Sequence, residues 1–167
     1  MKECMLKYYA SEFNGAIAGG IIGVTLLLST FLLWRVSDDY SMGQGISYVF
    51  FCAGLFFIIL CTVVAIRNRN KMEESFKVNS KDNITLQRAE IVRMEKVLDS
   101  AYTSGFILFS ILVVLGLLLA LIVQESFVLK GMGVGMLIVG VVGYCTEALS
   151  VKRNKAYLYE IRSQSFS

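Results

Sequence analysis

Four long apolar runs constrain the fold of this chain more than any other feature of its sequence. They are Ala16–Trp34, Ile46–Ile66, Phe106–Val123 and Phe127–Leu149. Each run has about 18–23 residues, enough for a helix to cross a hydrocarbon core of about 30 Å. Runs of this length are seldom the buried helices of a soluble protein. The sequence therefore predicts an all-α membrane protein, a four-span transmembrane helical bundle.

The basic residues are distributed unevenly, and their distribution predicts the orientation. Of the 16 Lys and Arg residues, only two lie on the side of the connections between the first and second runs and between the third and fourth: Arg35, directly after the first run, and Lys130, near the start of the fourth. Basic residues concentrate on the cytoplasmic side of membrane proteins. We therefore expect both termini and the middle segment 67–101 to be cytoplasmic.

The runs and the charges divide the chain into four segments. Residues 1–66 form a first transmembrane hairpin with a short cytoplasmic N-terminus, and residues 67–101 form a cytoplasmic helical segment. Residues 102–149 form a second transmembrane hairpin, and residues 150–167 form a cytoplasmic tail helix. Within the middle segment, NSKDN at residues 79–83 predicts an interruption, because these residue types favour turns and helix caps.

The ends of the second and fourth runs resemble each other. Residues 61–71 read CTVVAIRNRNK, and residues 145–155 read CTEALSVKRNK. An internal duplication would explain the match and would make the two hairpins parallel repeats, because each half crosses the membrane an even number of times. Alternatively, both stretches are ends of membrane helices that stop in Lys and Arg at the cytoplasmic side.

Glycines recur on one face of the first run and on one face of the fourth. Small side chains let helix backbones approach closely, which is a main source of helix association in lipid. The two stripes therefore predict either helix packing within one chain or the interface of a homo-oligomer. Their members are Gly15, Gly19, Gly23, Gly133, Gly140 and Gly143.

Glu147 is an ionisable residue within an apolar run. A carboxylate inside a membrane is costly and usually faces a partner or a wet cavity. Arg67 and Arg69 lie at the same predicted depth at the end of the second run, so we expect one of them to form an ion pair with Glu147. The alternative is that Glu147 lines a conducting path or takes part in gating.

The helix predicted from residue 84 onward has an apolar stripe and a charged surface. The stripe, which Gln87 interrupts, must pack on the chain's own helices, on a second copy or on the membrane surface. The charged surface is balanced, unlike the basic face of a membrane-surface helix, so we favour a protein contact for the stripe. The stripe consists of Ile84, Ile91, Met94 and Leu98. The charged surface, where we expect a partner to dock, consists of Arg88, Glu90, Arg93, Glu95 and Lys96.

Several classes of function are disfavoured by composition. The chain has no His, which removes His-ligated metals and His base catalysis. Its cytoplasmic carboxylates form no convergent pair in the sequence pattern. It has no Pro, and polar residues within the runs are few, which disfavours a transporter built on broken helices. We expect a protein that is not an enzyme and uses no cofactor.

These observations favour a non-catalytic, oligomeric membrane protein that acts as a sensor or docking platform for a cytosolic protein. The expected partners are further copies of the chain, the lipid bilayer and that protein, and direct nucleic-acid binding is not expected. Two alternatives stay open. One is a small oligomeric channel or pore-forming effector, and the other is an immunity protein against a membrane-active toxin.

In its size, its four spans, its cytoplasmic termini and its cytoplasmic helices, the chain resembles the membrane subunit of the Kiwa antiphage defence system. The resemblance covers the whole chain as architecture and includes no diagnostic motif. It implies an oligomer in the bacterial inner membrane that senses phage attack at the envelope. It also implies a cytosolic DNA-binding partner.

Overall fold

The computed structural model of this protein describes residues 2–77, 83–123 and 125–163. Within these ranges the regular structure is helical and contains no strand, so the predicted all-α class is confirmed. Four helices are long and apolar enough to cross a membrane. In chain order the elements are α1 (Lys2–Val36), α2 (Met42–Lys77), α3 (Asn83–Lys96), the π-helical turn η2 (Val97–Ala101), α4 (Tyr102–Ile122) and α5 (Phe127–Ser163).

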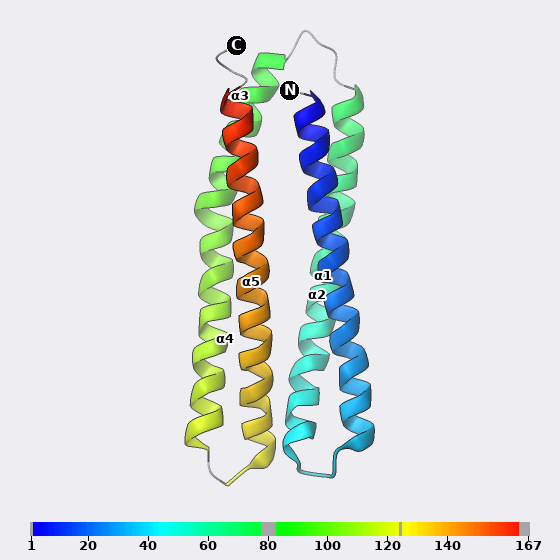
Figure 1. Cartoon of the computed structure of the whole chain (residues 1–167), viewed down its shortest axis with the longest axis vertical. Coiled ribbons are helices and arrows are strands. Elements are labelled where there is room, and N and C mark those ends of the chain that lie inside the picture. The colour runs from blue at the N-terminus through cyan, green and yellow to red at the C-terminus, as the bar shows by residue number, and fades with distance from the viewer. Residues whose placement is uncertain (1, 78–82, 124, 164–167) are drawn as a thin grey trace.

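The helices form two antiparallel hairpins that stand side by side, α1 with α2 and α4 with α5 (Figure 1). The start of α1, the end of α5 and the whole of α3 lie at one end of the bundle, which we call the terminal end. The connections α1–α2 and α4–α5 lie at the opposite end, which we call the loop end. Consecutive runs pair in this arrangement, because a short connection joins the first run to the second and the third to the fourth.

Glycine pairs let the two helices of each hairpin approach closely. A Cβ placed on Gly23 of α1 would lie 3.0 Å from the carbonyl oxygen of Gly54 on α2. A Cβ placed on Gly116 of α4 would lie 2.7 Å from the carbonyl oxygen of Gly133 on α5. Side chains at these positions would force the helices apart, so each hairpin depends on backbone contact of the kind common in lipid.

The contact between the two hairpins changes along the bundle. Near the loop end, Gly45 of α2 and Gly131 of α5 remove the side chains that would hold these two helices apart. At the terminal end α5 instead contacts α1, through Tyr8 and Asn154. This change of partner leaves room between the hairpins near the terminal end, where the candidate site lies.

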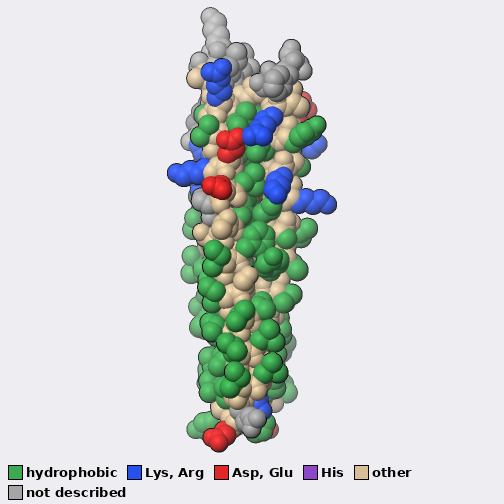
Figure 2. Space-filling model, turned by 90° about the vertical axis from the view of Figure 1, so that its left-hand side faces the viewer, with side chains coloured by type: hydrophobic (Ala, Val, Ile, Leu, Met, Phe, Trp, Pro, Cys, Tyr) green, Lys and Arg blue, Asp and Glu red, His purple; other side chains and the backbone are tan. Residues whose placement is uncertain are grey.

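Large apolar side chains cover the outside of the four runs (Figure 2). Ile21, Phe31 and Leu121 are examples that are more than half exposed. On the face shown in Figure 2, Lys and Arg side chains gather toward the terminal end, while hydrophobic side chains dominate the rest. An exposed apolar surface of this extent suits lipid rather than water. These are the features of a membrane protein.

The predicted middle segment forms parts of two long helices. α2 continues without a break past the second apolar run. Residues 79–82 of the predicted interruption lie outside the described residues, and α3 begins at Asn83. η2 joins α3 directly to α4, because the N–H of Tyr102 donates to the carbonyl of Val97 five residues earlier. The boundary predicted at residue 101 is therefore a π-helical turn within one continuous helix.

Candidate functional site

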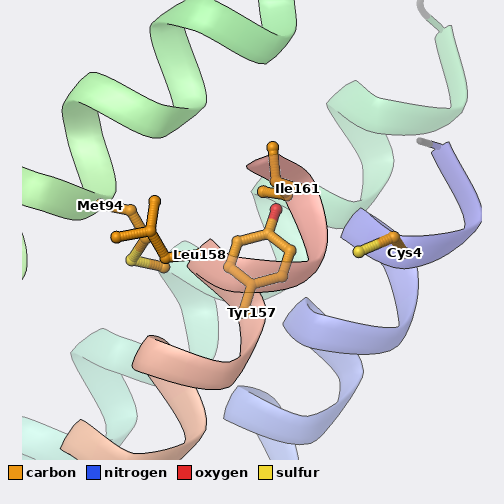
Figure 3. Close-up of a cluster of buried hydrophobic side chains, with 5 residues drawn as sticks. All are labelled: Cys4, Met94, Tyr157, Leu158 and Ile161. Carbon is orange, nitrogen blue, oxygen red and sulfur yellow. The ribbon is translucent and has the colours of Figure 1, made fainter. Parts of the chain in front are cut away.

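A small apolar core joins three helices at the terminal end (Figure 3). Cys4 of α1, Met94 of α3 and three residues of α5, Tyr157, Leu158 and Ile161, are buried together. Met94 and Ile161 have no exposed surface. Burial of a large apolar side chain contributes about 1.5–3 kcal/mol, so this core fixes α3 against α1 and α5. We call these three packed helix ends the head.

The predicted apolar stripe of α3 packs into the head. Ile91 and Leu98 are partly buried against its core, whereas the side chain of Ile84 lies outside the described residues. Gln87, which interrupts the stripe, donates from Nε2 to the carbonyl of Ile161 over 2.7 Å. That carbonyl lies in the last turn of α5. The described part of the stripe therefore packs on other helices of the same chain.

Glu90 lies at the centre of a buried polar network in the head. Its Oε1 accepts hydrogen bonds from the hydroxyls of Tyr9, at 2.9 Å, and Tyr157, at 3.2 Å. Arg93 donates to both carboxylate oxygens, over 2.9 and 2.6 Å, and its guanidinium lies over the ring of Tyr9. Hydrogen bonds to charged groups contribute about 1.5–3 kcal/mol each. The network therefore ties α3 to both α1 and α5.

This network corrects the prediction for Glu90 and Arg93, which we expected on the exposed docking surface. Glu90 is only 7% exposed and Arg93 is partly buried. The physical reason is the pair of tyrosine hydroxyls from α1 and α5, which satisfies a carboxylate on the inner side of α3. Burial works to raise the pKa of the Glu90 carboxyl, but the hydrogen bonds and charge of Arg93, with the two hydroxyls, outweigh it and lower the pKa.

The other three predicted docking residues, Arg88, Glu95 and Lys96, are exposed. Val92, which is 64% exposed, lies between them on the same side of α3, because residues three and four apart share a helix face. Glu95 forms an ion pair with Arg162 near the end of α5. We call Arg88, Val92, Glu95 and Lys96 the α3 face. It is smaller than predicted, and it has an apolar residue at its centre.

Asn154 of α5 connects α1 and α4 and is 1% exposed. Its Oδ1 accepts from the hydroxyl of Tyr8 over 2.7 Å, and its Nδ2 donates to the hydroxyl of Tyr102. The ring of Tyr8 stacks on that of Tyr157, with 3.8 Å between the ring centroids. Sequence reasoning noted Asn154 only as part of a repeated Arg-Asn-Lys triplet. The available signal was the tyrosines that precede the first and third runs.

A charged cleft opens between the hairpins next to the head. Arg153 of α5 and Glu12 of α1 face each other there, with 3.4 Å between Arg153 Nε and Glu12 Oε1. Both atoms are buried, and neither has a hydrogen-bond partner among the described residues. Ser150 accepts a hydrogen bond from Arg153 over 3.1 Å. Gly15 provides space for the guanidinium, because a Cβ on Gly15 would lie 2.7 Å from one of its nitrogens.

Glu147 enters the same cleft from α5. Its carboxylate packs against Gly105 of α4, where a Cβ would lie 2.9 Å from Oε1. In the described part of the chain, no hydrogen bond or ion pair joins this carboxylate to another residue. The predicted ion pair with Arg67 or Arg69 is wrong. Both arginines are exposed on α2, and Arg69 pairs with Glu73 one turn further along, over 3.4 Å.

The cleft has a volume of about 370 Å³, with charged groups toward the head and an apolar wall toward the runs. The apolar wall includes Ile22, Phe57 and Phe109. An apolar groove of about 400 Å³, lined by α2, α4 and α5, adjoins the cleft and shares Phe57 and Phe109 with it. Among the residues that the structure describes, no three Cys, Asp or Glu side chains are grouped so that they could hold a metal ion.

The two predicted glycine stripes face other helices of the same chain. The glycines of the first run face α5 or α2, and those of the fourth run face α4: Gly15, Gly19, Gly23, Gly133, Gly140 and Gly143. Packing within one chain therefore accounts for all six.

Comparison of the chain with protein-family models, with curated proteins and with solved structures gives no match in any of the three. Its function must therefore be inferred from the head, the α3 face and the charged cleft. The head combines a packed core with an exposed charged surface. The cleft offers an unpaired carboxylate beside an ion pair, an arrangement that attracts a cation.

Proposed function

We propose that this chain is a non-catalytic membrane platform that docks a soluble protein on its head. The proposal includes homo-oligomers in the bacterial inner membrane, with the head in the cytoplasm. It also includes a role in antiphage defence, which the resemblance to the Kiwa membrane subunit implies. The observation that carries the proposal is the head, in which a buried core and the Glu90 network fix three helix ends beyond the apolar runs.

The two ends of the bundle differ in what they offer to a partner in water. At the loop end the connections are short, residues 37–41 and 123–126. At the terminal end the packed core holds α3 in a fixed orientation and leaves the α3 face exposed. An apolar residue such as Val92 within a rim of charges is typical of a protein-binding surface. This difference supports docking at the head.

The distribution of Lys and Arg supports a cytoplasmic head. Single cysteines can test this orientation in a variant whose four native cysteines are replaced by Ala. Asp39→Cys and Ser126→Cys, at the loop end, should react with a membrane-impermeant maleimide in intact cells. Glu160→Cys, in the head, should react only after permeabilisation. Reaction of Glu160→Cys in intact cells would contradict the proposed orientation.

Charge reversal on the α3 face tests docking. In cells that express the tagged chain, Arg88→Glu with Lys96→Glu should reduce co-purification of the soluble partner at least about tenfold, as loss of interface charges commonly does. Arg93 stays unchanged because it holds Glu90. The matched control reverses Lys152 and Lys155, which are exposed on α5. Equal co-purification by both variants would contradict docking at the α3 face.

The unpaired carboxylate of Glu147 favours a second candidate function, a small channel. In an oligomer, such carboxylates could line a path for cations. Liposomes that contain the purified chain would then show cation flux, and Glu147→Gln would reduce it while the oligomeric mass stays unchanged. Absence of flux from liposomes with the wild-type chain would contradict this candidate and leave the docking proposal untouched.

A further inference from the structure

The charged groups of the cleft are not balanced. Glu12 and Arg153 face each other, whereas Glu147 brings a second carboxylate that no described residue compensates. A carboxylate away from bulk water is costly unless a cation accompanies it. A ligand that completes this site must therefore place a cationic group beside Glu147.

The ion pair itself restricts the ligand further. Arg153 Nε and Glu12 Oε1 are buried and face each other at 3.4 Å without an aligned hydrogen bond. A primary ammonium has three N–H donors and can serve two carboxylates, and a phosphate accepts hydrogen bonds from a guanidinium. A headgroup with both an ammonium and a phosphate would satisfy Glu12, Glu147 and Arg153 together.

Two glycines make room for this arrangement from opposite hairpins. Gly15 of α1 admits the guanidinium of Arg153, and Gly105 of α4 admits the carboxylate of Glu147. In each case an added Cβ would lie less than 3 Å from the charged group. The charged ends of two α5 side chains thus point to opposite walls of the cleft, with space between the walls.

The remainder of the cleft is largely apolar and shares two wall residues with the neighbouring groove. Phe57 and Phe109 line both spaces, and from there the groove follows α2 and α4 to Tyr48 and Met132 near the loop end. This path lies along the apolar runs. An acyl chain suits it by chemistry, because transfer of apolar surface onto apolar walls is favourable.

We propose that the cleft and the groove bind an aminophospholipid from the surrounding bilayer. Its ammonium lies between Glu147 and Glu12, its phosphate lies at Arg153, and one acyl chain lies in the groove between α2 and α4. The proposal does not depend on docking at the α3 face. It makes the chain a receptor for one headgroup of the membrane that it spans.

Competition between two lipids tests the headgroup. The full chain, purified in detergent, is given an equimolar mixture of phosphatidylethanolamine and phosphatidylcholine with identical acyl chains, and retained lipid is measured by native mass spectrometry. The trimethylammonium of phosphatidylcholine has no N–H donor. We expect about tenfold more retained phosphatidylethanolamine, the factor that corresponds to one charge-assisted hydrogen bond. Equal retention of the two lipids would overturn the proposal.

Two variants test the two parts of the site separately. Glu147→Gln should abolish the preference for phosphatidylethanolamine, whereas the control Asp99→Asn, an exposed carboxylate outside the cleft, should keep it. Cys52→Trp places a large side chain in the groove from an exposed position and should reduce retention of both lipids. A preference that persists in Glu147→Gln, or retention unaffected by Cys52→Trp, would contradict the assigned site.

Soluble ligands separate a lipid site from a simple ion site. Phosphoethanolamine or NaCl added to delipidated protein should raise its unfolding temperature much less than phosphatidylethanolamine does, because neither fills the groove. If either solute stabilises the protein as strongly as the lipid does, and loses the effect in Glu147→Gln, the site recognises a free ion and the lipid proposal is wrong.

Discussion

The two matching stretches, residues 61–71 and 145–155, contain the same Arg-Asn-Lys triplet in different surroundings. On α2, Arg69 and Asn70 are exposed, and Arg69 pairs with Glu73 at the surface. On α5, Arg153 enters the charged cleft and Asn154 is almost fully buried. Identical residues at the ends of two spanning helices therefore make different contacts. An internal similarity in sequence need not produce equivalent environments.

The difference follows from the neighbours of each helix at the terminal end. The start of α1 and the inner side of α3 pack against α5 there, so the second stretch becomes part of the head. The charged residues of the first stretch remain outside. Four comparisons of stability test this difference, and each pairs a variant with a control. They are given from the largest expected effect to the smallest.

Asn154→Ala should have the largest effect of these changes. It removes the partner of two partly buried tyrosine hydroxyls, those of Tyr8 and Tyr102. An unsatisfied buried polar group costs about 1–3 kcal/mol, so we expect a loss of about 2–4 kcal/mol in the free energy of unfolding. Asn70→Ala, on the exposed stretch, should cost less than about 0.5 kcal/mol. Unfolding by SDS titration in mixed micelles measures both. Equal losses would mean that the environments are alike after all.

Gly19→Ile should come next, because Gly19 faces the first stretch. A Cβ on Gly19 would lie 2.6 Å from Cys61 Sγ, so the larger side chain should cost about 1–3 kcal/mol. Gly20→Ile is the control, since a Cβ there meets nothing within 4 Å. Adding Cys61→Ala to Gly19→Ile should recover part of the loss, whereas adding Cys145→Ala should not. The same titration measures all four variants. Recovery by Cys145→Ala would contradict the contact.

Arg153→Ala should destabilise the chain more than Arg69→Ala. Removal of Arg153 leaves Glu12, whose side chain is 15% exposed, without its partner. Because the Arg153 side chain is itself 38% exposed, we expect a loss of about 1–2 kcal/mol rather than the larger cost of a fully buried pair. Arg69 takes part in an exposed pair four residues apart, worth about 0.5 kcal/mol or less. Thermal unfolding in detergent measures the difference, and a larger loss for Arg69→Ala would reverse the comparison.

The smallest expected effect is a change in how stability depends on pH below 5. The pKa of Glu90 is lowered in the folded head, so the stabilisation from its ionised form is complete above the unfolded pKa of about 4.3. It is lost as the pH falls through the lower folded pKa. Between pH 5 and pH 3, the free energy of unfolding should therefore fall less for Glu90→Gln than for the wild type. Thermal unfolding in detergent over this pH range measures both. Glu73→Gln, beside the exposed stretch, should follow the wild type. Parallel curves for Glu90→Gln would contradict the network.

Sequence reasoning recovered the parts of the structure that depend on local pattern. Apolar runs of sufficient length predicted the spanning helices, and heptad spacing predicted that Ile91 and Leu98 would be covered. The network of Glu90 and the burial of Asn154 could not be read in this way. Their partners Tyr9 and Tyr8 lie 81 and 146 positions away in the chain. No periodicity within one helix shows which distant hydroxyl will face it.

The same limit explains the mistaken partner of Glu147. The sequence pattern indicates Arg67 and Arg69 because they follow the second run at the same predicted depth. Depth, however, fixes only one coordinate, and rotation about the helix axis decides which neighbour a side chain meets. Glu147 faces Gly105 of α4, while the two arginines are exposed on α2. Gly143, one turn before Glu147, belongs to a predicted glycine stripe and does pack on α4, where a Cβ would meet Phe109.

The π-helical turn η2 has a consequence for spacing. One additional residue in a turn offsets the helix on either side by about 100° relative to an uninterrupted α-helix. Met94 therefore points into the head, and Gly105 faces Glu147, only while the number of residues between them is kept. Deletion of a single residue from this segment would rotate either Met94 or Gly105 away from its partner, although no other residue had changed. In related chains, this stretch should accept exchanges of residues far more readily than changes of length.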